Sequence, residues 1–239
     1  MIAPTTKIYN WINSPTGVRI LPFVAFMSFI ALEEGLRTLL SRQLLDFDAT
    51  LLYWLYFPKA LCVGALLLLF WGKYIEINWY DLRNLKTSAM SFGSGLLVFV
   101  LWINMDWTLG GQNPPPGFNP EVFDSELIKW LMIAIRITGA VIIVPIMEEL
   151  FWRSFLLRYL INPDFMAVAI GRFTLFSFIS VCLLFGLEHH YLFAGVMAGV
   201  VFNGIYYWTR SIVHCILSHA VANLGLAVYV LINSQWRFW

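Results

Sequence analysis

Long, uninterrupted apolar stretches dominate this sequence and leave few folds open to it. Each is close to the roughly 20 residues that an α-helix needs to cross the hydrocarbon core of a bilayer. They lie at about 19–40, 50–71, 88–105, 127–160, 172–190, 191–209 and 212–232. Because backbone polar groups within lipid must be satisfied internally, only helices or a closed barrel can span. The runs are continuous and do not alternate with the period of a strand, which selects helices.

The composition supports a membrane environment for the whole chain. Hydrophobic residues make up 60% and charged residues 12%, whereas a soluble domain carries about 25% charged residues. We therefore predict an all-α, polytopic transmembrane bundle of about 6–8 helices. The expected organisation is a single integral membrane domain, 1–239, with N-terminal spans and loops at about 1–126 and a C-terminal core at about 127–232.

The fourth apolar stretch is too long for one span perpendicular to the membrane, since a helix rises about 1.5 Å per residue. We expect it to begin as an interfacial helix near Glu126–Arg136 and to become the true span near Gly139, with Pro145 as a kink.

Two polar connections predict the orientation. The segment Gly72–Thr87 carries Lys73, Arg83 and Lys86, whereas Gly110–Pro120 is a turn-forming stretch followed by acidic residues. The excess of basic residues predicts that the first connection is cytoplasmic and that the second lies outside.

Several functional classes are excluded or disfavoured. A net charge of +1 gives no electrostatic case for nucleic-acid binding. Cys62, Cys182 and Cys215 lie in apolar runs without the spacing of a disulfide framework or a zinc site. The first twenty residues show no cleavable signal peptide, so the first span is expected to direct insertion.

The first chemically unusual segment is Glu148-Glu149-Leu-Phe-Trp-Arg153, inside an apolar run. A charge at the centre of a span costs about 2.5–3.5 kcal/mol on insertion scales, so such residues are candidates for function. Glu149 and Arg153 are four residues apart, with the acid first, which favours a helical ion pair. Glu148 points about 100° away and is free to face another group. The alternative is a helix end in the headgroup region, with Arg153 snorkelling.

Two further segments each place polar residues one helical turn apart. Phe185 precedes His189 by four positions, with His190 adjacent, and His219 precedes Asn223 by four. A histidine at the end of a span can simply be interfacial, and a His/Asn pair within a span can bridge two helices by hydrogen bonds.

Taken together and in this order, the three segments resemble the CPBP family of membrane proteins. That family groups type II CAAX prenyl proteases with bacteriocin-processing and immunity proteins, and its marks are EExxxR, FxxxH and HxxxN. The resemblance covers about residues 127–232, with Ser154 where family members often have Gly. The matching residues are Glu148, Glu149, Arg153, Phe185, His189, His219 and Asn223.

The first half of the chain is similar to a subgroup that accompanies bacterial exosortase systems. This similarity rests on Tyr56–Lys59, Leu97–Trp102, Asp106 and Phe118–Pro120. It implies a multi-pass protein of the bacterial inner membrane, with a membrane-anchored protein or peptide as substrate and an exosortase-like sorting system as a partner.

The family resemblance implies an intramembrane endopeptidase. Glu148 would be the general base, His189 would orient the water, and His219 with Asn223 would stabilise the oxyanion. Glu149, Arg153 and Phe185 would support them. No cofactor is favoured.

Three alternatives remain open at this stage. A zinc enzyme could use Glu148, Glu149, His189 and His219 as ligands, although the HExxH motif is absent. A catalytically inactive scaffold or immunity-type partner, or a small transporter, would also place polar residues within spans.

Overall fold

The computed structural model describes residues 4–108 and 117–239, and all the regular structure in these ranges is helical. Residues 110–116 of the expected loop lie outside them. The longer α-helices are α1 (Pro4–Ile12), α2 (Pro15–Ser41), α3 (Tyr56–Leu69), α4 (Leu85–Asn104), α5 (Glu126–Thr138), α8 (Leu175–Leu187), α9 (Leu192–Thr209) and α10 (Ile212–Asn233). The short 3₁₀ turns are η1 (Ala49–Leu55), η2 (Trp71–Lys73), η3 (Trp79–Arg83), η5 (Pro120–Val122), η8 (Phe165–Ala167) and η9 (Trp236–Phe238).

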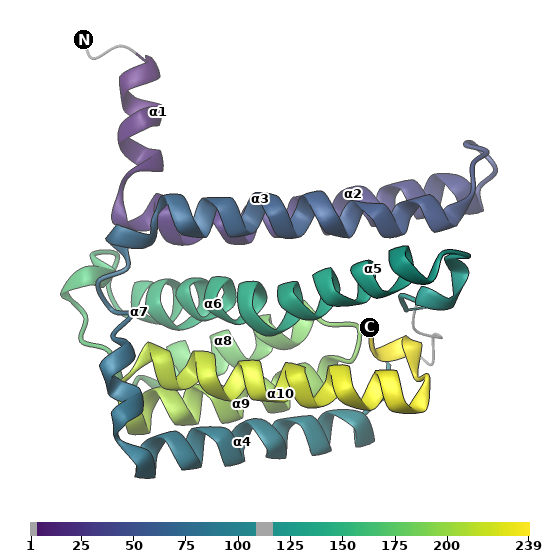
Figure 1. Ribbon diagram of the computed structural model, residues 1–239. Helices are drawn as coiled ribbons and strands as arrows, with labels where there is room; N and C mark the ends of the chain where they lie inside the picture. The colour runs from purple at the N-terminus through teal and green to yellow at the C-terminus, as the bar shows by residue number, and fades with distance from the viewer. Residues whose placement is uncertain (1–3, 109–116) are drawn as a thin grey trace.

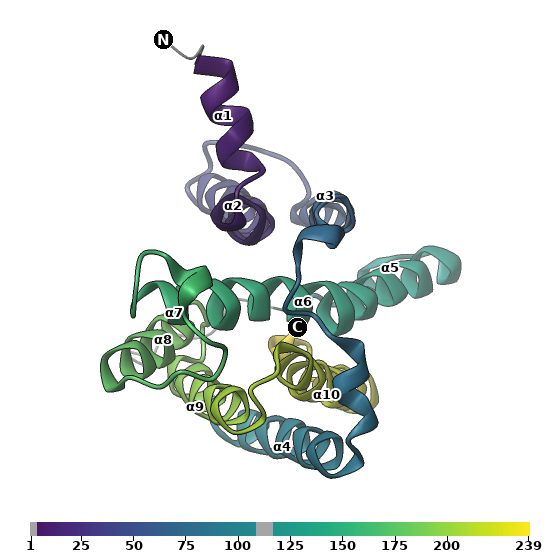
Figure 2. The same cartoon turned by 90° about the vertical axis from the view of Figure 1, so that its left-hand side faces the viewer.

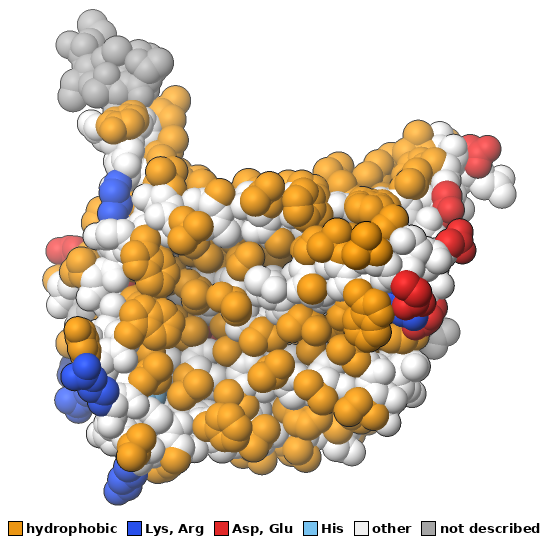
Figure 3. All heavy atoms as spheres, in the orientation of Figure 1, with side chains coloured by type: hydrophobic (Ala, Val, Ile, Leu, Met, Phe, Trp, Pro, Cys, Tyr) orange, Lys and Arg blue, Asp and Glu red, His pale blue; other side chains and the backbone are white. Residues whose placement is uncertain are grey.

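The helices form the predicted multi-pass membrane bundle. Among the described residues, six helical runs are long and apolar enough to cross a membrane. The face shown in Figure 3 is largely apolar between its ends, with most of the visible Lys and Arg at one end of the bundle and most of the visible Asp and Glu at the other. Apolar flanks between two charged ends are the pattern expected of a bundle that sits across a bilayer.

The run from Glu126 to Tyr159 differs from expectation. The expected break near Gly139 between an interfacial helix and a span is not present in the described run, because α5 continues without interruption into the segments that follow (Figure 1). Five consecutive segments build one unbroken helical run of 34 residues: α5, the π-helical η6 (Gly139–Ile143), α6 (Val144–Glu149), the π-helical η7 (Leu150–Leu156) and α7 (Leu157–Tyr159). At about 1.5 Å per residue the run is about 51 Å long, which exceeds the hydrocarbon core.

The predicted stretch 172–190 is also shorter than expected. α8 has 13 residues, or about 20 Å of helix. It begins only after Thr174, whose side chain caps the helix by accepting from the backbone N–H of Ser177. Arg172 therefore lies outside the helix, in the exposed last part of the connection between α7 and α8.

α10 lies at the centre of the bundle, among α4, α9 and α6 (Figure 2). α9 and α10 are joined by a very short turn in which Arg210 adopts a left-handed conformation, with φ of 52°. α4 approaches α10 closely because Gly95 has no side chain, since a Cβ there would lie 2.3 Å from the backbone oxygen of Ser218. Small residues permit such contact between membrane helices.

α2 and α3 pack on each other and form a separate layer, on the opposite side of the α5–α7 run from α10 (Figures 1 and 2). The polar connection after α3 returns to the start of α2, where Glu76 accepts hydrogen bonds from Arg19 at 2.7 and 2.6 Å. Ser154, from the long helical run, also donates to Glu76. This cluster ties three parts of the bundle together at its basic end.

Candidate active site

Glu148 and Glu149 are the last residues of α6 and lie between the two π-helical segments. Pro145 has no N–H to donate to Val141, and its ring would crowd that carbonyl in a regular α-helix. The wide turn of η6 precedes Pro145 directly and accommodates it without breaking the run. The local sequence thus determines where along the helical run the side chains of Glu148 and Glu149 project.

Glu149 anchors a buried polar network that joins the long helical run to α9 and α10. Its Oε1 accepts from Nη1 of Arg153 at 3.0 Å and lies 2.9 Å from Nδ1 of His219. Nε of Arg153 donates to Oδ1 of Asn203, on α9, at 3.0 Å. Glu149, Arg153 and Asn203 are completely inaccessible to solvent. Charges buried this deeply require partners, and Glu149 and Arg153 have each other, although Oε2 of Glu149 and Nη2 of Arg153 have no hydrogen-bond partner among the described residues.

Aromatic rings enclose this network. The guanidinium of Arg153 lies 4.8 Å from the ring of Phe185 and 5.4 Å from that of Phe202. The imidazole of His219 stacks on Phe202 with ring centroids 4.9 Å apart. Phe185 therefore packs against the ion pair, and the rings exclude water from it.

Glu148 faces away from the network and toward a cavity. Its Oε2 lies 4.0 Å from Nε2 of His219, beyond direct hydrogen-bond distance. Among the described residues this buried oxygen has no hydrogen-bond partner. A buried carboxylate oxygen without a partner is unusual and calls for a ligand such as water.

His189 lies just after the end of α8, in the turn to α9. Its Nδ1 is 2.7 Å from the backbone oxygen of Phe185. Because a carbonyl only accepts, Nδ1 carries the hydrogen, and Nε2 of the neutral ring is left as an acceptor. The indole of Trp102, from α4, packs edge-on against the imidazole, with ring centroids 5.2 Å apart, and holds its orientation.

Asn223 lies one turn after His219 on α10. Its side-chain amide donates to the backbone oxygen of Ala140 at 2.7 Å. Ala140 belongs to the π-helical segment η6, so this bond joins α10 to the wide turn that positions Glu148. One N–H of the amide is used here, and the second remains available for a ligand.

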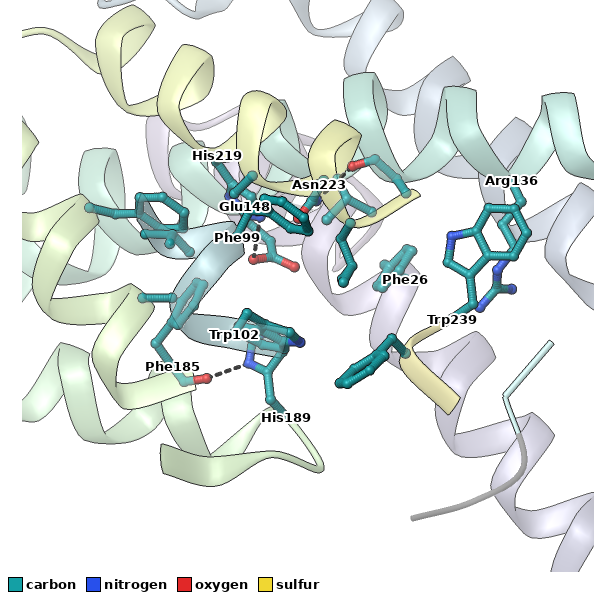
Figure 4. A pocket seen from close by; sticks show the side chains of 18 of the residues that line it. Phe26, Phe99, Trp102, Arg136, Glu148, Phe185, His189, His219, Asn223 and Trp239 are labelled. Atoms are coloured by element: carbon teal, nitrogen blue, oxygen red, sulfur yellow. Dashed lines mark hydrogen bonds and ion pairs between the residues drawn. The ribbon is translucent and has the colours of Figure 1, made fainter. Parts of the chain in front are cut away.

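All four residues predicted to be catalytic line one cavity of about 310 Å³ (Figure 4). They are Glu148, His189, His219 and Asn223. Apolar and aromatic side chains make up most of the remaining wall, and two cations, Lys59 and Arg136, complete it. A mostly apolar cavity with a few convergent polar groups is the usual form of a ligand site.

Three residues that sequence reasoning did not assign also belong to this region. Glu188 accepts from the indole N–H of Trp152 at 3.2 Å, and Asn203 holds Arg153. The sequence offered a signal for two of them: Glu188 directly precedes His189, and Asn203 is a polar residue within an apolar helix. Trp152 carried no signal, because tryptophan is frequent throughout the chain.

The proposed zinc ligands do not assemble around a common point. Within residues 4–108 and 117–239, no three His, Cys, Asp or Glu side chains are grouped so as to hold a metal ion. Glu149, one of the four candidates, instead contacts Arg153 and Nδ1 of His219. Metal independence stays a prediction.

Comparison with known proteins supports the motif assignment. Residues 130–225 match a family model described as type II CAAX prenyl endopeptidase Rce1-like. The matched range contains Glu148, Glu149, Arg153, Phe185, His189, His219 and Asn223. No curated protein and no solved structure matches the chain.

Proposed function

Taking the Rce1-like match of residues 130–225 as the premise, we propose that this multi-pass membrane protein is an intramembrane endopeptidase that acts on a membrane-anchored protein or peptide. The observation that carries the proposal is the partnerless Oε2 of Glu148, which faces the cavity that His189, His219 and Asn223 also line. Such a carboxylate is suited to receive a proton from water.

In the proposed reaction a water molecule binds between Glu148 and His189. Nε2 of His189 accepts one of its hydrogen bonds, and Glu148 removes a proton as the water oxygen attacks the carbonyl carbon of the peptide. The bond between carbon and nitrogen then breaks, and Glu148 passes the proton to the leaving amine. Water is consumed, and the products are a carboxylic acid and an amine.

The oxyanion that forms during attack needs hydrogen-bond donors at a fixed position. Asn223 has one free amide N–H for this purpose, because the other donates to Ala140. His219 donates from Nε2 in its imidazolium form, with Nδ1 donating to Glu149. Glu149 and Arg153 fix the ring from behind.

We further propose a bacterial inner membrane location, with an exosortase-like sorting system as the partner. Exposed Lys73, Arg83 and Lys86 lie at one end of the bundle, which supports a cytoplasmic placement of that end. The acidic residues of the opposite end would then lie outside. The substrate would be a peptide anchored in the same membrane.

The test is reconstitution of the full chain in liposomes with a panel of membrane-anchored peptides, read by mass spectrometry. We expect cleavage at a defined bond by the wild type and a rate lower by about 10²–10⁴-fold for Glu148→Gln. A folded, reconstituted protein that cleaves no peptide of the panel, including anchored tails of co-encoded exosortase substrates, would favour the scaffold. Accumulation of an intact peptide or ion across the liposome would favour the transporter.

A further inference from the structure

Lys59 and Arg136 form a pair of cations beside the candidate active site. Lys59 lies in the first turn of α3, and Arg136 lies near the end of α5. Both line the cavity that contains Glu148, and both also line a second cavity of about 310 Å³. The two cavities have several wall residues in common, including His189 and Trp102, so the cationic pair lies at their junction. Figure 4 shows Arg136 across the cavity from Glu148.

Neither cation forms a direct ion pair in the part of the chain that the structure describes, although Glu33, which is itself paired with Arg37, attracts both from a longer distance. The other two arginines of the second cavity are neutralised, Arg37 by Glu33 at 2.7 Å and Arg237 by Asp106 at 3.1 Å. In contrast, no described carboxylate lies within 4 Å of the side-chain nitrogens of Lys59 or Arg136, and neither side chain makes a hydrogen bond.

Aromatic rings hold both cations in place. The ammonium of Lys59 lies 4.9 Å from the ring centroid of Tyr56 and 4.8 Å from that of Phe26. The guanidinium of Arg136 lies 4.8 Å from the same Tyr56 ring and 4.8 Å from that of Phe118. Ring faces compensate only part of the cost of withdrawing a cation from water. Two like charges around one ring also repel each other, so an anion between them would be stabilised.

Access decides which anion fits. Lys59 is only 7% exposed, so its ammonium is reached through the cavity and not from the lipid-facing surface. A ligand that already occupies the active-site cavity is therefore favoured over the headgroup of a surrounding lipid. The planar guanidinium of Arg136 matches a carboxylate with two parallel hydrogen bonds.

We propose that Lys59 and Arg136 form a specificity subsite for a carboxylate of the peptide substrate. The assignment rests on the proposed protease function, because the carboxylate is placed on the peptide. Arg136 precedes Glu148 by 12 positions on one helical run, or about 18 Å. An extended peptide covers about 3.3–3.6 Å per residue. An extended peptide therefore spans this distance with about five residues between the carboxylate and the bond that is cleaved.

Binding tests this subsite separately from cleavage. The full-length Glu148→Gln variant in detergent is titrated against dansyl-labelled, N-dodecanoyl hexapeptides by fluorescence anisotropy. One pair has the same neutral sequence with either a free terminal carboxylate or a terminal amide. A second series is amidated and carries one Asp, or its Asn counterpart, at each position in turn. The series distinguishes a terminal carboxylate from an acidic side chain as the bound group.

We expect one acidic peptide to bind about 10-fold or more tightly than its neutral counterpart, as a charge-assisted hydrogen bond requires. Adding Lys59→Met or Arg136→Gln should abolish this preference, and Lys59→Arg should retain it. Arg37→Gln is the matched control, since it removes a cation of the second cavity that is already paired, and it should leave the preference intact. Unchanged melting temperatures separate loss of binding from loss of fold.

Equal affinity for acidic and neutral peptides throughout the series, or no measurable binding of either, would overturn the subsite. So would a preference that survives Lys59→Met combined with Arg136→Gln. Competition by dioleoylphosphatidic acid and not by an acidic peptide would assign the pair to a lipid phosphate instead. Selective binding of an acidic peptide, together with an absence of cleavage by the wild type, would contradict the protease proposal but support the carboxylate subsite.

Discussion

Nδ1 of His219 lies 2.9 Å from Oε1 of Glu149, although the two residues are 70 positions apart. With Nδ1 directed at a carboxylate, Nε2 is the nitrogen that faces the cavity and Glu148. A carboxylate behind an imidazole orients the ring and stabilises its charged form in unrelated hydrolases. The two acids of the motif therefore have different surroundings: Glu149 contacts Arg153 and His219, whereas Glu148 lines the cavity.

We predict that Glu148→Gln lowers the rate of cleavage by about 10²–10⁴-fold, the usual contribution of a general base. The melting temperature should stay equal or rise, because the substitution removes a buried charge that has no hydrogen-bond partner at Oε2. Cleavage of an anchored peptide and thermal unfolding in detergent measure the two effects. Asp124→Asn, at an exposed acid, is the control. A parallel loss of stability in Glu148→Gln would contradict a purely chemical role.

We predict that Arg153→Ala destabilises the protein by about 3–5 kcal/mol, because it leaves Glu149 buried without its cation. The control is Arg37→Ala, which breaks a more exposed ion pair of the same spacing and should cost about 0.3–0.5 kcal/mol. Yield of folded protein and melting temperature are the measurements. Similar small losses in both variants would show that the buried network does not support the fold.

Metal dependence is best tested with two neighbouring variants. If His219 and Asn223 both donate to the oxyanion, then Asn223→Ala should lower the rate by about 10²–10³-fold, nearly as much as His219→Ala. A zinc mechanism predicts a large effect of His219→Ala and a mild effect of Asn223→Ala, since asparagine is an uncommon zinc ligand. Stoichiometric zinc in active protein, lost with activity on chelation and restored with it, would refute the metal-free reaction.

Helix packing near the site gives a prediction with a control on the same helix. Gly95→Ala should destabilise the protein by about 1–3 kcal/mol, because the new methyl group would meet the backbone of Ser218, next to His219. Gly93→Ala should be neutral or stabilising by up to about 1 kcal/mol, because no atom lies within 4 Å of its Cβ and alanine favours helix. Thermal unfolding compares them, and equal effects would contradict the close approach of α4 and α10.

The basic end of the bundle should show a defined pH dependence. Burial alone would raise the pKa of Glu76. The hydrogen bonds and charge of Arg19, together with a hydrogen bond from Ser154, lower it by more than burial raises it, so the pKa in the folded protein lies below the ordinary 4.5. A carboxyl group whose pKa is lower in the folded than in the unfolded protein stabilises the fold. This stabilisation is complete above the unfolded pKa of about 4.5 and is lost as the pH falls through the pKa of the folded protein. Glu76→Gln should therefore cost about 1.5–3 kcal/mol at pH 7 and progressively less below pH 4.5. A difference that does not change with pH would contradict the ionic contact.

The sequence was most informative where local periodicity decides the outcome. The long apolar runs predicted the membrane helices, and the four-residue spacing predicted the ion pair of Glu149 and Arg153. Contacts between distant segments carry no such periodicity. The pairing of His219 with Glu149 and that of Asn223 with Ala140 depend on how α10 packs against the long helical run, so spacing along one helix could not give them.

The same reasoning explains what was mispredicted in the long run. Its length suggested a bend into an interfacial helix, because hydropathy measures how much apolar chain is present and not how it is wound. The structure absorbs the length in a continuous helix with two π-helical segments. Asn203 shows the opposite case, since its polarity was visible within α9 but its partner, Arg153, was 50 positions away.

Because of the two π-helical segments, the number of residues around the motif matters more for the direction of Glu148 and Glu149 than the identity of the neighbouring apolar side chains. A π turn holds one residue more than an α turn, so removal of one residue from 139–143 could leave an intact, regular helix. It would nevertheless rotate Glu148 and Glu149 by about 100° relative to α5 and exchange the groups that they face. Insertions and deletions in this stretch should therefore be far more damaging than conservative apolar replacements. The number of residues in the two π-helical segments therefore determines which of two adjacent, chemically identical acids faces the cavity.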